Sequence, residues 1–265
     1  MNSHGMRGPV AEESEAKPIS TRVALVTGAS RGIGAAIARA LAARGCHVVI
    51  TARSASDLEA VASEIRRCGG TASVIPADIV NREGTMGLVR SILGAQGRID
   101  ILVSCAGVLN EAALLDLTDE ALANAFETNL LAPARLTREV ARAMVSQRSG
   151  RIIYIGSMFA DVTARGYMAY TSSKAGLAGL AKTLAVELAP LGIPVNTVAP
   201  GHVRTDMIRE LLDLPDGEAR IARNTPSKRI AEPEEVASVV AFLALDAPSF
   251  LTGEVIRVDG GYTCQ

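Results

Sequence analysis

A tyrosine and a lysine lie four residues apart, as Tyr170 and Lys174, in the sequence YTSSK. On a helix, this spacing places both side chains on one face. A nearby ammonium group favours the phenolate and lowers the tyrosine pKa, so Tyr170 can exchange a proton with a carbonyl or alcohol oxygen. The same spacing is common by chance on amphipathic helices, so the pair needs support from neighbouring residues.

Two other polar residues are candidates for the same chemistry. Ser157 follows the apolar run 151–155 through Gly156. This places its hydroxyl at the carboxyl end of a predicted strand, where open α/β sheets bind ligands. A turn or capping serine is the competing interpretation. Asn129 is a poor helix former within a helical pattern, and its spacing alone predicts a surface position.

A glycine-rich segment, Thr27–Gly34, reads TGASRGIG and connects an apolar run to a helical pattern. Glycines permit a tight turn and let backbone N–H groups and the positive end of a helix approach a pyrophosphate. The spacing is G-x-x-x-G-x-G, so the dinucleotide fingerprint G-x-G-x-x-G is met only in outline. A strand-to-helix turn without a ligand is the alternative.

The position that distinguishes NAD from NADP carries a cation. In the fingerprint, an acid about 20 residues after the glycines binds the ribose 2′-hydroxyl of NAD, whereas an arginine accommodates the 2′-phosphate of NADP. Arg53 occupies this place, and Arg31 adds a second cation in the glycine loop. Both favour NADP(H). The alternatives are that Arg53 is a solvated loop charge and that Asp57 caps the next helix.

Alternating strand and helix patterns must position these groups. Short apolar or β-branched runs predict seven strands, at Val23–Thr27, His47–Thr51, Ser73–Pro76, Ile99–Val103, Arg151–Ile155, Ile193–Val198 and Val255–Val258. Helical spacing is found at Gly32–Arg44, Asp57–Cys68, Arg82–Ala95, Asp119–Ser146, Met168–Leu188 and Pro233–Leu245. This alternation predicts an α/β fold, a Rossmann-like, doubly wound parallel sheet with helices on both faces.

Length and composition indicate one globular domain. The chain has 265 residues, of which 48% are hydrophobic and 21% charged, enough for a sizeable core and unlike a disordered protein. Residues 1–20 are polar and aperiodic, which predicts a flexible N-terminal tail before a domain at 21–265. Residues 202–228 are rich in loop signals and are predicted to form a flap on the substrate side.

Several classes of partner are not expected. Lys and Arg number 27 against 28 Asp and Glu, so no basic excess exists for nucleic acid. No run approaches 18 apolar residues and no signal-peptide core is present, so we expect a cytoplasmic protein without a membrane span. The four cysteines and three histidines are dispersed, so no metal site is predicted.

From Thr21 to Tyr262, the chain resembles the short-chain dehydrogenase/reductase family. The motifs that carry the resemblance are the loop TGxxxGxG at 27–34, Asn129, Ser157, the YxxxK pair at 170 and 174, Asp78-Ile79, and Pro200-Gly201 with Thr205. One motif departs from the family, whose usual N-N-A-G after the fourth strand reads Ser104-Cys105-Ala106-Gly107 here. The departure affects the side chains of that turn and leaves its small cofactor-facing residues in place.

The resemblance implies a role for each catalytic candidate. Tyr170 would be the acid/base, Ser157 would bind the substrate oxygen, and Asn129 would anchor a proton-relaying water. Lys174 would hold the nicotinamide ribose and lower the Tyr170 pKa. The implied cofactor-binding residues are Gly28, Ser30, Arg31, Gly32, Ile33, Gly34, Arg53, Asp78, Ile79, Ala106, Gly107, Tyr170, Lys174, Pro200, Gly201, Val203 and Thr205.

The resemblance also implies a reaction and an assembly. The reaction is NADP(H)-dependent interconversion of a carbonyl and a secondary alcohol. The assembly is a homotetramer or homodimer in which the helices predicted at Asp119–Ser146 and Met168–Leu188 pair between subunits. A non-catalytic dinucleotide sensor is the alternative of another class, but such proteins typically lose the tyrosine or the lysine, and both stand here.

Within the family, the chain looks most like the 3-oxoacyl carrier-protein reductases. Their substrates are carrier-protein or CoA thioesters, and Arg135 matches a basic position that they use against the acidic carrier protein. A solvated helix charge is the other interpretation of Arg135. The second basic position is Val186 here, and Ala185-Val186-Glu187 also resembles polyol and sugar-acid dehydrogenases. A polyol, sugar-acid or secondary-metabolite ketone is therefore the alternative substrate.

Overall fold

The computed structural model describes residues 21–265, and the predicted tail at 1–20 lies outside the described residues. Seven parallel strands form one sheet in the order β3-β2-β1-β4-β5-β6-β7. The strands are β1 Val23–Thr27, β2 His47–Thr51, β3 Thr71–Val74, β4 Ile101–Ser104, β5 Arg151–Ile155, β6 Val195–Pro200 and β7 Val255–Val258. The predicted doubly wound α/β fold is therefore confirmed.

Nine α-helices and several short helical turns connect the strands within the described residues. The α-helices are α1 Gly32–Ala43, α2 Ala55–Arg67, α3 Arg82–Gln96, α4 Asp119–Phe126, α5 Ala132–Gln147, α6 Met168–Leu188, α7 Arg209–Leu212, α8 Gly217–Asn224 and α9 Pro233–Leu245. The short turns are η1 Glu127–Leu131, η2 Met158–Ala160, η3 Ala189–Leu191, η4 Asp206–Ile208 and η5 Tyr262–Cys264.

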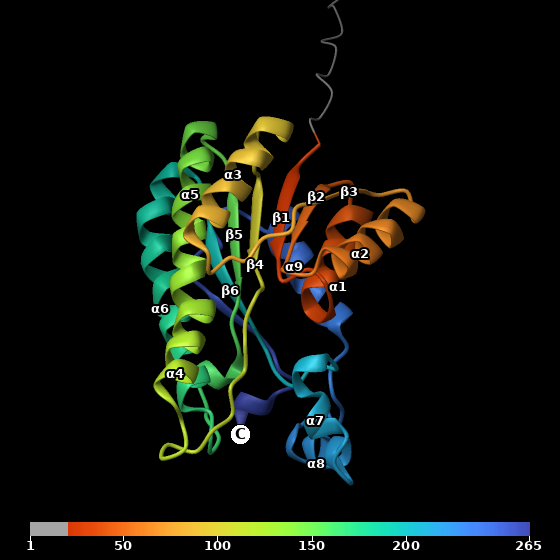
Figure 1. The fold of residues 1–265 in the computed structure, drawn as a ribbon, viewed down its shortest axis with the longest axis vertical. Helices are drawn as coiled ribbons and strands as arrows, with labels where there is room; N and C mark the ends of the chain where they lie inside the picture. Colours follow the sequence, from red (N-terminus) through yellow and green to blue (C-terminus); the bar gives the residue numbers. More distant parts are fainter. Residues whose placement is uncertain (1–20) are drawn as a thin grey trace, which may run out of the picture.

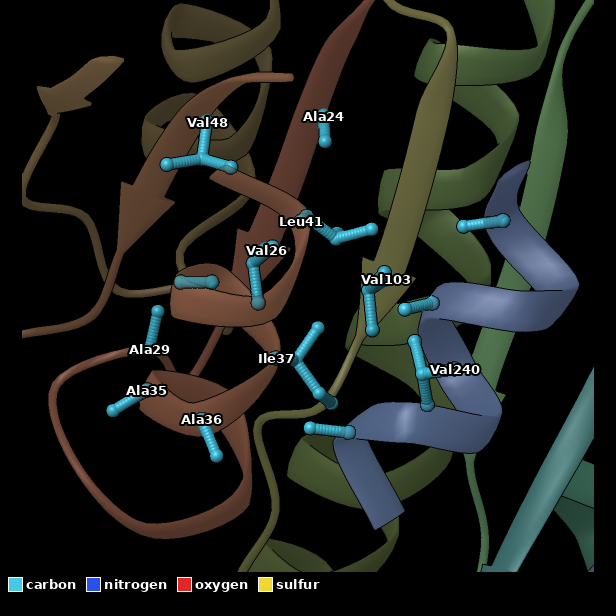
Figure 2. Packing of buried hydrophobic residues seen from close by; sticks show 14 of the residues in the cluster. Ala24, Val26, Ala29, Ala35, Ala36, Ile37, Leu41, Val48, Val103 and Val240 are labelled. Atoms are coloured by element: carbon cyan, nitrogen blue, oxygen red, sulfur yellow. The ribbon is translucent and has the colours of Figure 1, made fainter. Parts of the chain in front are cut away.

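Helices cover both faces of the sheet, with α1, α2 and α9 on one face and α3, α5 and α6 on the other (Figure 1). Successive residues of a strand point to opposite faces. In β1, Ala24 and Val26 therefore pack toward the first group of helices, and Leu25 packs toward the second. Figure 2 shows Ile37 of α1 and Val240 of α9 beside Val26 and Val103 of the sheet. Burial on both faces explains why the inner strands β1 and β4 are nearly continuous apolar runs.

The strand order reverses between β1 and β4. The chain runs outward from β1 through β2 to β3 and then crosses back to place β4 on the other side of β1. In doubly wound sheets, such a reversal opens a crevice at the carboxyl ends of the two strands. This is where Thr27 ends β1 and Ser104 ends β4.

Three strands differ from their predicted bounds by about two residues. β3 was expected at Ser73–Pro76 and lies at Thr71–Val74, where its register pairs Thr71 with His47 of β2. Pro76 has no N–H to donate to a sheet, so it cannot extend the strand. β4 and β6 begin two residues later than expected, at Ile101 and Val195.

The helix predicted at Asp119–Ser146 is wrong as a single element. It is divided into α4 and α5 by the π-helical turn η1, in which the Ala132 N–H donates to the Glu127 carbonyl five residues earlier. Pro133 has no N–H for the carbonyl of Asn129, four residues before it, so regular α-helical bonding cannot pass this point. Such π-turns are frequent at functional sites.

Residues 202–228 contain η4, α7 and α8, short elements that the sequence patterns did not predict. Figure 1 shows α7 and α8 beyond the carboxyl ends of the strands, at the end of the molecule that contains the crevice. Within residues 21–265, no helix combines the length and the apolar character needed to cross a bilayer.

Candidate functional site

A single cavity of about 810 Å³ lies at the crevice between β1 and β4 and extends to α6 and to the segment after β6. It is lined by the glycine-rich loop at one end and by Ser157, Tyr170 and Lys174 at the other. Every residue of the predicted cofactor-binding set lines this cavity. Gly28 and Thr205, which are 177 positions apart in the chain, are thus brought to one site.

The glycine-rich loop lies too close to its neighbours for side chains. Gly28 has φ +64°, and a Cβ there would lie 2.8 Å from the Ala106 Cα. A Cβ on Gly34 would lie 2.2 Å from the Gly28 carbonyl oxygen. Only glycine fits either position, so the backbone itself forms this wall of the cavity.

The start of α1 is suited to an anion. Arg31 occupies the N-cap without a side-chain cap hydrogen bond, and the first turn contains no acidic residue. The first N–H groups of a helix have no intrahelical partner, and the positive end of the helix dipole favours negative charge. Together with the glycine wall, this arrangement fits the pyrophosphate of a dinucleotide.

Thr27 holds the β1 and β4 ends of the site together. Its Oγ1 accepts hydrogen bonds from the backbone N–H groups of Cys105 at 3.0 Å and Ala106 at 3.2 Å. The turn that departs from the family motif is thus fixed through its backbone. Ala106 and Gly107 remain in the cavity wall although asparagine side chains are missing at Ser104 and Cys105.

Two arginines line the nucleotide end. Arg53 is exposed and forms no ion pair among the described residues, whereas Arg31 lies 3.7 Å from the Asp206 carboxylate. The predicted capping role of Asp57 is wrong, because the N-cap of α2 is Ser54, whose Oγ accepts from the Asp57 N–H at 3.4 Å. The free guanidinium of Arg53 beside the cavity is suited to an anionic group.

The catalytic candidates meet at the other end of the cavity. Tyr170 and Lys174 project from one face of α6, and the Lys174 Nζ lies 5.8 Å from the centroid of the Tyr170 ring. The Lys174 Nζ donates a hydrogen bond of 2.9 Å to the Ile155 carbonyl at the end of β5. Ser157 follows that strand and caps the turn η2 by accepting from the Phe159 N–H, so its capping interpretation is confirmed. It also lines the cavity close enough to Tyr170 to lower the pKa of the phenol, and its role in the site stays a prediction.

The expected lowering of the Tyr170 pKa by Lys174 is not found. Tyr170 is 7% exposed, and burial raises its pKa, against the hydrogen bond with Ser157, which lowers it. Burial also lowers the pKa of Lys174 to about 8. Burial opposes the charged form of either group, and the groups that act on the Tyr170 pKa besides burial are Ser157, Tyr167 and Cys105. At neutral pH, Tyr170 thus carries its proton and Lys174 is mostly charged.

The prediction that Asn129 lies on the surface is wrong. It is fully buried, and its Nδ2 donates to the Val108 carbonyl and the Ser173 Oγ, both at 3.0 Å. Its Oδ1 accepts from the Val108 N–H at 2.9 Å. A Cβ on Gly107 would lie 3.2 Å from the same oxygen. Asn129 therefore fixes the loop after β4 against α6, next to Lys174.

Aromatic side chains form a wall that the sequence patterns did not assign to the site. Phe159, Tyr167 and His202 line the cavity with Tyr170. The Phe159 ring centroid lies 4.8 Å from that of Tyr167 and 6.0 Å from that of His202. No motif marks these residues, and the scarcity of aromatic residues, 3% of the chain, was the only available signal.

Neither interpretation of Arg135 fits the structure. Its side chain is 16% exposed and pairs with Glu127 of the π-turn. A solvated charge would be open to water, and a docking cation would be free for an acidic partner. Arg135 instead links α5 to η1, while Val186, at the other position considered, is 78% exposed.

Comparison with known proteins gives consistent matches over this whole region. Residues 28–263 match the family model described as enoyl-(acyl carrier protein) reductase. The chain is 41% identical over 240 residues to the 3-oxoacyl-(acyl-carrier-protein) reductase FabG of Escherichia coli, covering 91% of this chain and 96% of FabG. It is 38% identical over 261 residues to the short-chain reductase protein NovJ of Streptomyces niveus, covering 97% and 99%.

Solved structures share the fold. A gluconate 5-dehydrogenase from Burkholderia cenocepacia, in complex with NADP and tartrate, superposes with a TM-score of 0.89 at 30% identity. The match covers 93% of this chain and 97% of that one.

Proposed function

The chain belongs to the short-chain dehydrogenase/reductase family of oxidoreductases, and from this we propose that it is an NADPH-dependent reductase of 3-oxoacyl thioesters. The observation that carries the proposal is the cavity in which a glycine-walled anion site faces Tyr170, with Ser157 and the buried Lys174 beside the phenol. The thioester is favoured by the similarity to FabG.

The bound cofactor supplies the hydride, and the protein supplies position and electrostatics. The glycine wall and the start of α1 would hold the pyrophosphate, and Arg53 and Arg31 the 2′-phosphate. Lys174 lies between Tyr170 and the Ala106-Gly107 wall, where its ammonium can bind ribose hydroxyls. The free Arg53 guanidinium, with no acid in its place in the sequence, supports NADP(H) over NAD(H).

The protein groups divide the proton transfer between them. Ser157 donates a hydrogen bond to the substrate carbonyl and orients it toward Tyr170. Tyr170 donates its proton to the same oxygen as negative charge develops there. The charged Lys174 then stabilises the phenolate that remains. Burial raises the pKa of Tyr170, so the phenol is protonated at neutral pH and can act as the proton donor in the reductive direction.

Two alternatives have less support. A sugar acid needs a cation for its carboxylate, but the cations that line the cavity within the described residues are Arg31, Arg53 and Lys174. The first two lie at the nucleotide end. A non-catalytic sensor would not need Ser157 and Tyr170 joined beside a buried lysine.

The assembly and location are part of the proposal. We infer from the family a homotetramer or homodimer acting in the cytoplasm, with α5 and α6 at the subunit contact.

The proposal is tested by the initial rate of NADPH oxidation with the acetoacetyl thioester of N-acetylcysteamine, with NADH run in parallel. We expect turnover with NADPH, slower turnover with NADH, and the 3-hydroxyacyl thioester as product. Binding of NADPH without thioester reduction, combined with reduction of simple ketones or oxidation of polyols, would contradict the thioester assignment.

A further inference from the structure

The aromatic side chains of this protein are few and concentrated. The chain contains four tyrosines, four phenylalanines and no tryptophan. Four of these eight rings, those of Phe159, Tyr167, Tyr170 and Tyr262, belong to one contact group that also includes His202. In a chain with so few aromatic residues, this concentration at the catalytic end points to a specific use.

The rings form a continuous wall. Phe159 contacts Tyr167 in a tilted arrangement and meets Tyr170 edge to face, with centroids 6.4 Å apart. Tyr167 also meets Tyr170 edge to face at 6.4 Å. His202 extends the wall from Phe159 and is backed by Tyr262, whose centroid lies 5.5 Å from its own. The catalytic phenol thus lies next to two other rings that line the same cavity.

Apolar side chains continue the lining from the segment after β6. Met207, Ile208 and Leu211 line the cavity, in and beside η4 and α7. Of the cations in the lining, Lys174 is the one at the catalytic end, and it is bonded to Ile155. This end of the cavity therefore suits a flat, uncharged group. Edge-to-face and offset-stacked contacts prefer an aromatic ring to an alkyl group of equal size.

His202 adds one polar function to this wall. Its Nδ1 is enclosed and has no hydrogen-bond partner among the described residues. Burial lowers the His202 pKa, so the ring is neutral at pH 7 and carries one N–H. An enclosed N–H without a partner costs more than an enclosed lone pair, so the tautomer with its hydrogen on Nε2 is favoured. We assign this N–H as the hydrogen-bond donor that His202, a lining residue, offers the cavity.

We propose that the substrate carries an aromatic ring on the reacting carbonyl carbon, and that this ring packs against Phe159 and Tyr167 while His202 Nε2 donates to an acceptor on the substrate. The inference rests on the proposed function and narrows its substrate class to 3-aryl-3-oxoacyl thioesters. The reacting oxygen lies at Tyr170, the aryl group lies along the wall beside it, and the thioester carbonyl is the acceptor for His202.

The test compares kcat/KM for three N-acetylcysteamine thioesters with NADPH: 3-oxo-3-phenylpropanoyl, 3-cyclohexyl-3-oxopropanoyl and acetoacetyl. The phenyl and cyclohexyl compounds have similar size and differ in flatness and π-character. Because conjugation makes the aryl ketone less reactive toward hydride, each kcat/KM is divided by the rate of borohydride reduction of the same compound before the two are compared. From the strength of aromatic pairs, we expect the phenyl compound to exceed the cyclohexyl one by about threefold to tenfold. A cyclohexyl compound that equals or exceeds the phenyl compound would overturn the inference.

Variants connect the preference to the wall. In Phe159→Leu, we expect the phenyl-to-cyclohexyl ratio to fall toward one. The matched control is Phe250→Leu, the same change at a ring that is 97% exposed, and it should keep the wild-type ratio.

His202→Phe, which keeps a ring and removes the N–H, should lower kcat/KM by about threefold to tenfold, with His202→Gln closer to wild type. An unchanged ratio in Phe159→Leu would overturn the role of the wall, and an unchanged kcat/KM in His202→Phe would overturn that of the donor.

The ethyl oxygen esters of the same three acids separate the two levels of the argument. If thioesters react but phenyl gives no advantage, the aryl inference fails and the proposed function stands. If the oxygen esters react and all thioesters are inert, the thioester assignment fails, and the phenyl-to-cyclohexyl ratio measured on the oxygen esters still decides the aromatic inference.

Discussion

Burial has opposite effects on the two titratable side chains at the catalytic end. It raises the pKa of Tyr170 and lowers that of Lys174 to about 8. Each shift disfavours the charged form, so the phenol is kept protonated while the ammonium begins to titrate above neutral pH. A protonated phenol is the form that the proposed reaction needs, and Ser157 is the neighbouring side chain that acts against the rise in pKa.

Removing this proton donor should affect turnover and leave cofactor binding intact. In Tyr170→Phe, we expect kcat for thioester reduction to fall by roughly 10² to 10⁴, the usual contribution of a general acid. NADPH affinity should change little, because the ring remains. Since the chain has no tryptophan, the fluorescence of NADPH can be titrated without transfer from that residue. A variant that turns over at the wild-type rate would contradict the role of Tyr170.

At the scale of elements, the alternation of strand and helix patterns predicted much of the fold. Four of the seven strands, β1, β2, β5 and β7, have the predicted ends. The apolar runs of β1, β2 and β5 are buried on both faces of the sheet, whereas β7 lies at its edge, is only partly buried and was recognisable by its β-branched residues. The π-turn was not predictable from periodicity. It depends on Pro133 within the helix and on bonds from Asn129 to Val108, a residue 21 positions away.

The site shows the same division between local and distant determinants. Tyr170 and Lys174 share one helix, so their spacing was informative. Phe159 and His202 come from segments after different strands and meet only when β5 and β6 pair. This contact cannot be predicted from a single sequence. The same is true of the partial burial of Arg135 and its ion pair with Glu127.

The π-turn should be a measurable source of stability. Asn129→Ala would leave the partly buried N–H and carbonyl of Val108 without their partners, at a cost of about 1–3 kcal/mol in the free energy of unfolding. The exposed Asn224, at the end of α8 and away from the turn, provides the control Asn224→Ala, with an expected cost within about 0.5 kcal/mol. The urea midpoint measured by circular dichroism checks both, and equal midpoints for the two variants would refute the structural role.

At the scale of the whole molecule, the reversal of strand order assembles the site from both halves of the sheet. The glycine-rich loop and Arg53 belong to the β1–β2 half, and Ser157, Tyr170 and Lys174 belong to the β4–β6 half. A dinucleotide in the cavity contacts both halves at once, so its binding should stabilise the entire domain. By mass action, a ligand at 100 times its Kd adds about 2.7 kcal/mol to the free energy of unfolding.

This coupling gives a test of cofactor preference that needs no substrate. Thermal unfolding should shift upward more with NADPH than with an equal concentration of NADH. In Arg53→Ala, we expect NADPH affinity to fall by about tenfold, because a charge-assisted bond to the 2′-phosphate is lost, and the NADH shift to stay the same. Arg67→Ala removes an exposed arginine at the far end of α2 and should change neither shift. If Arg53→Ala lowers the affinities for NADPH and NADH equally, Arg53 supports the loop without binding the 2′-phosphate. If NADH raises the unfolding temperature of the wild type more than NADPH does, the assignment of NADP(H) is reversed.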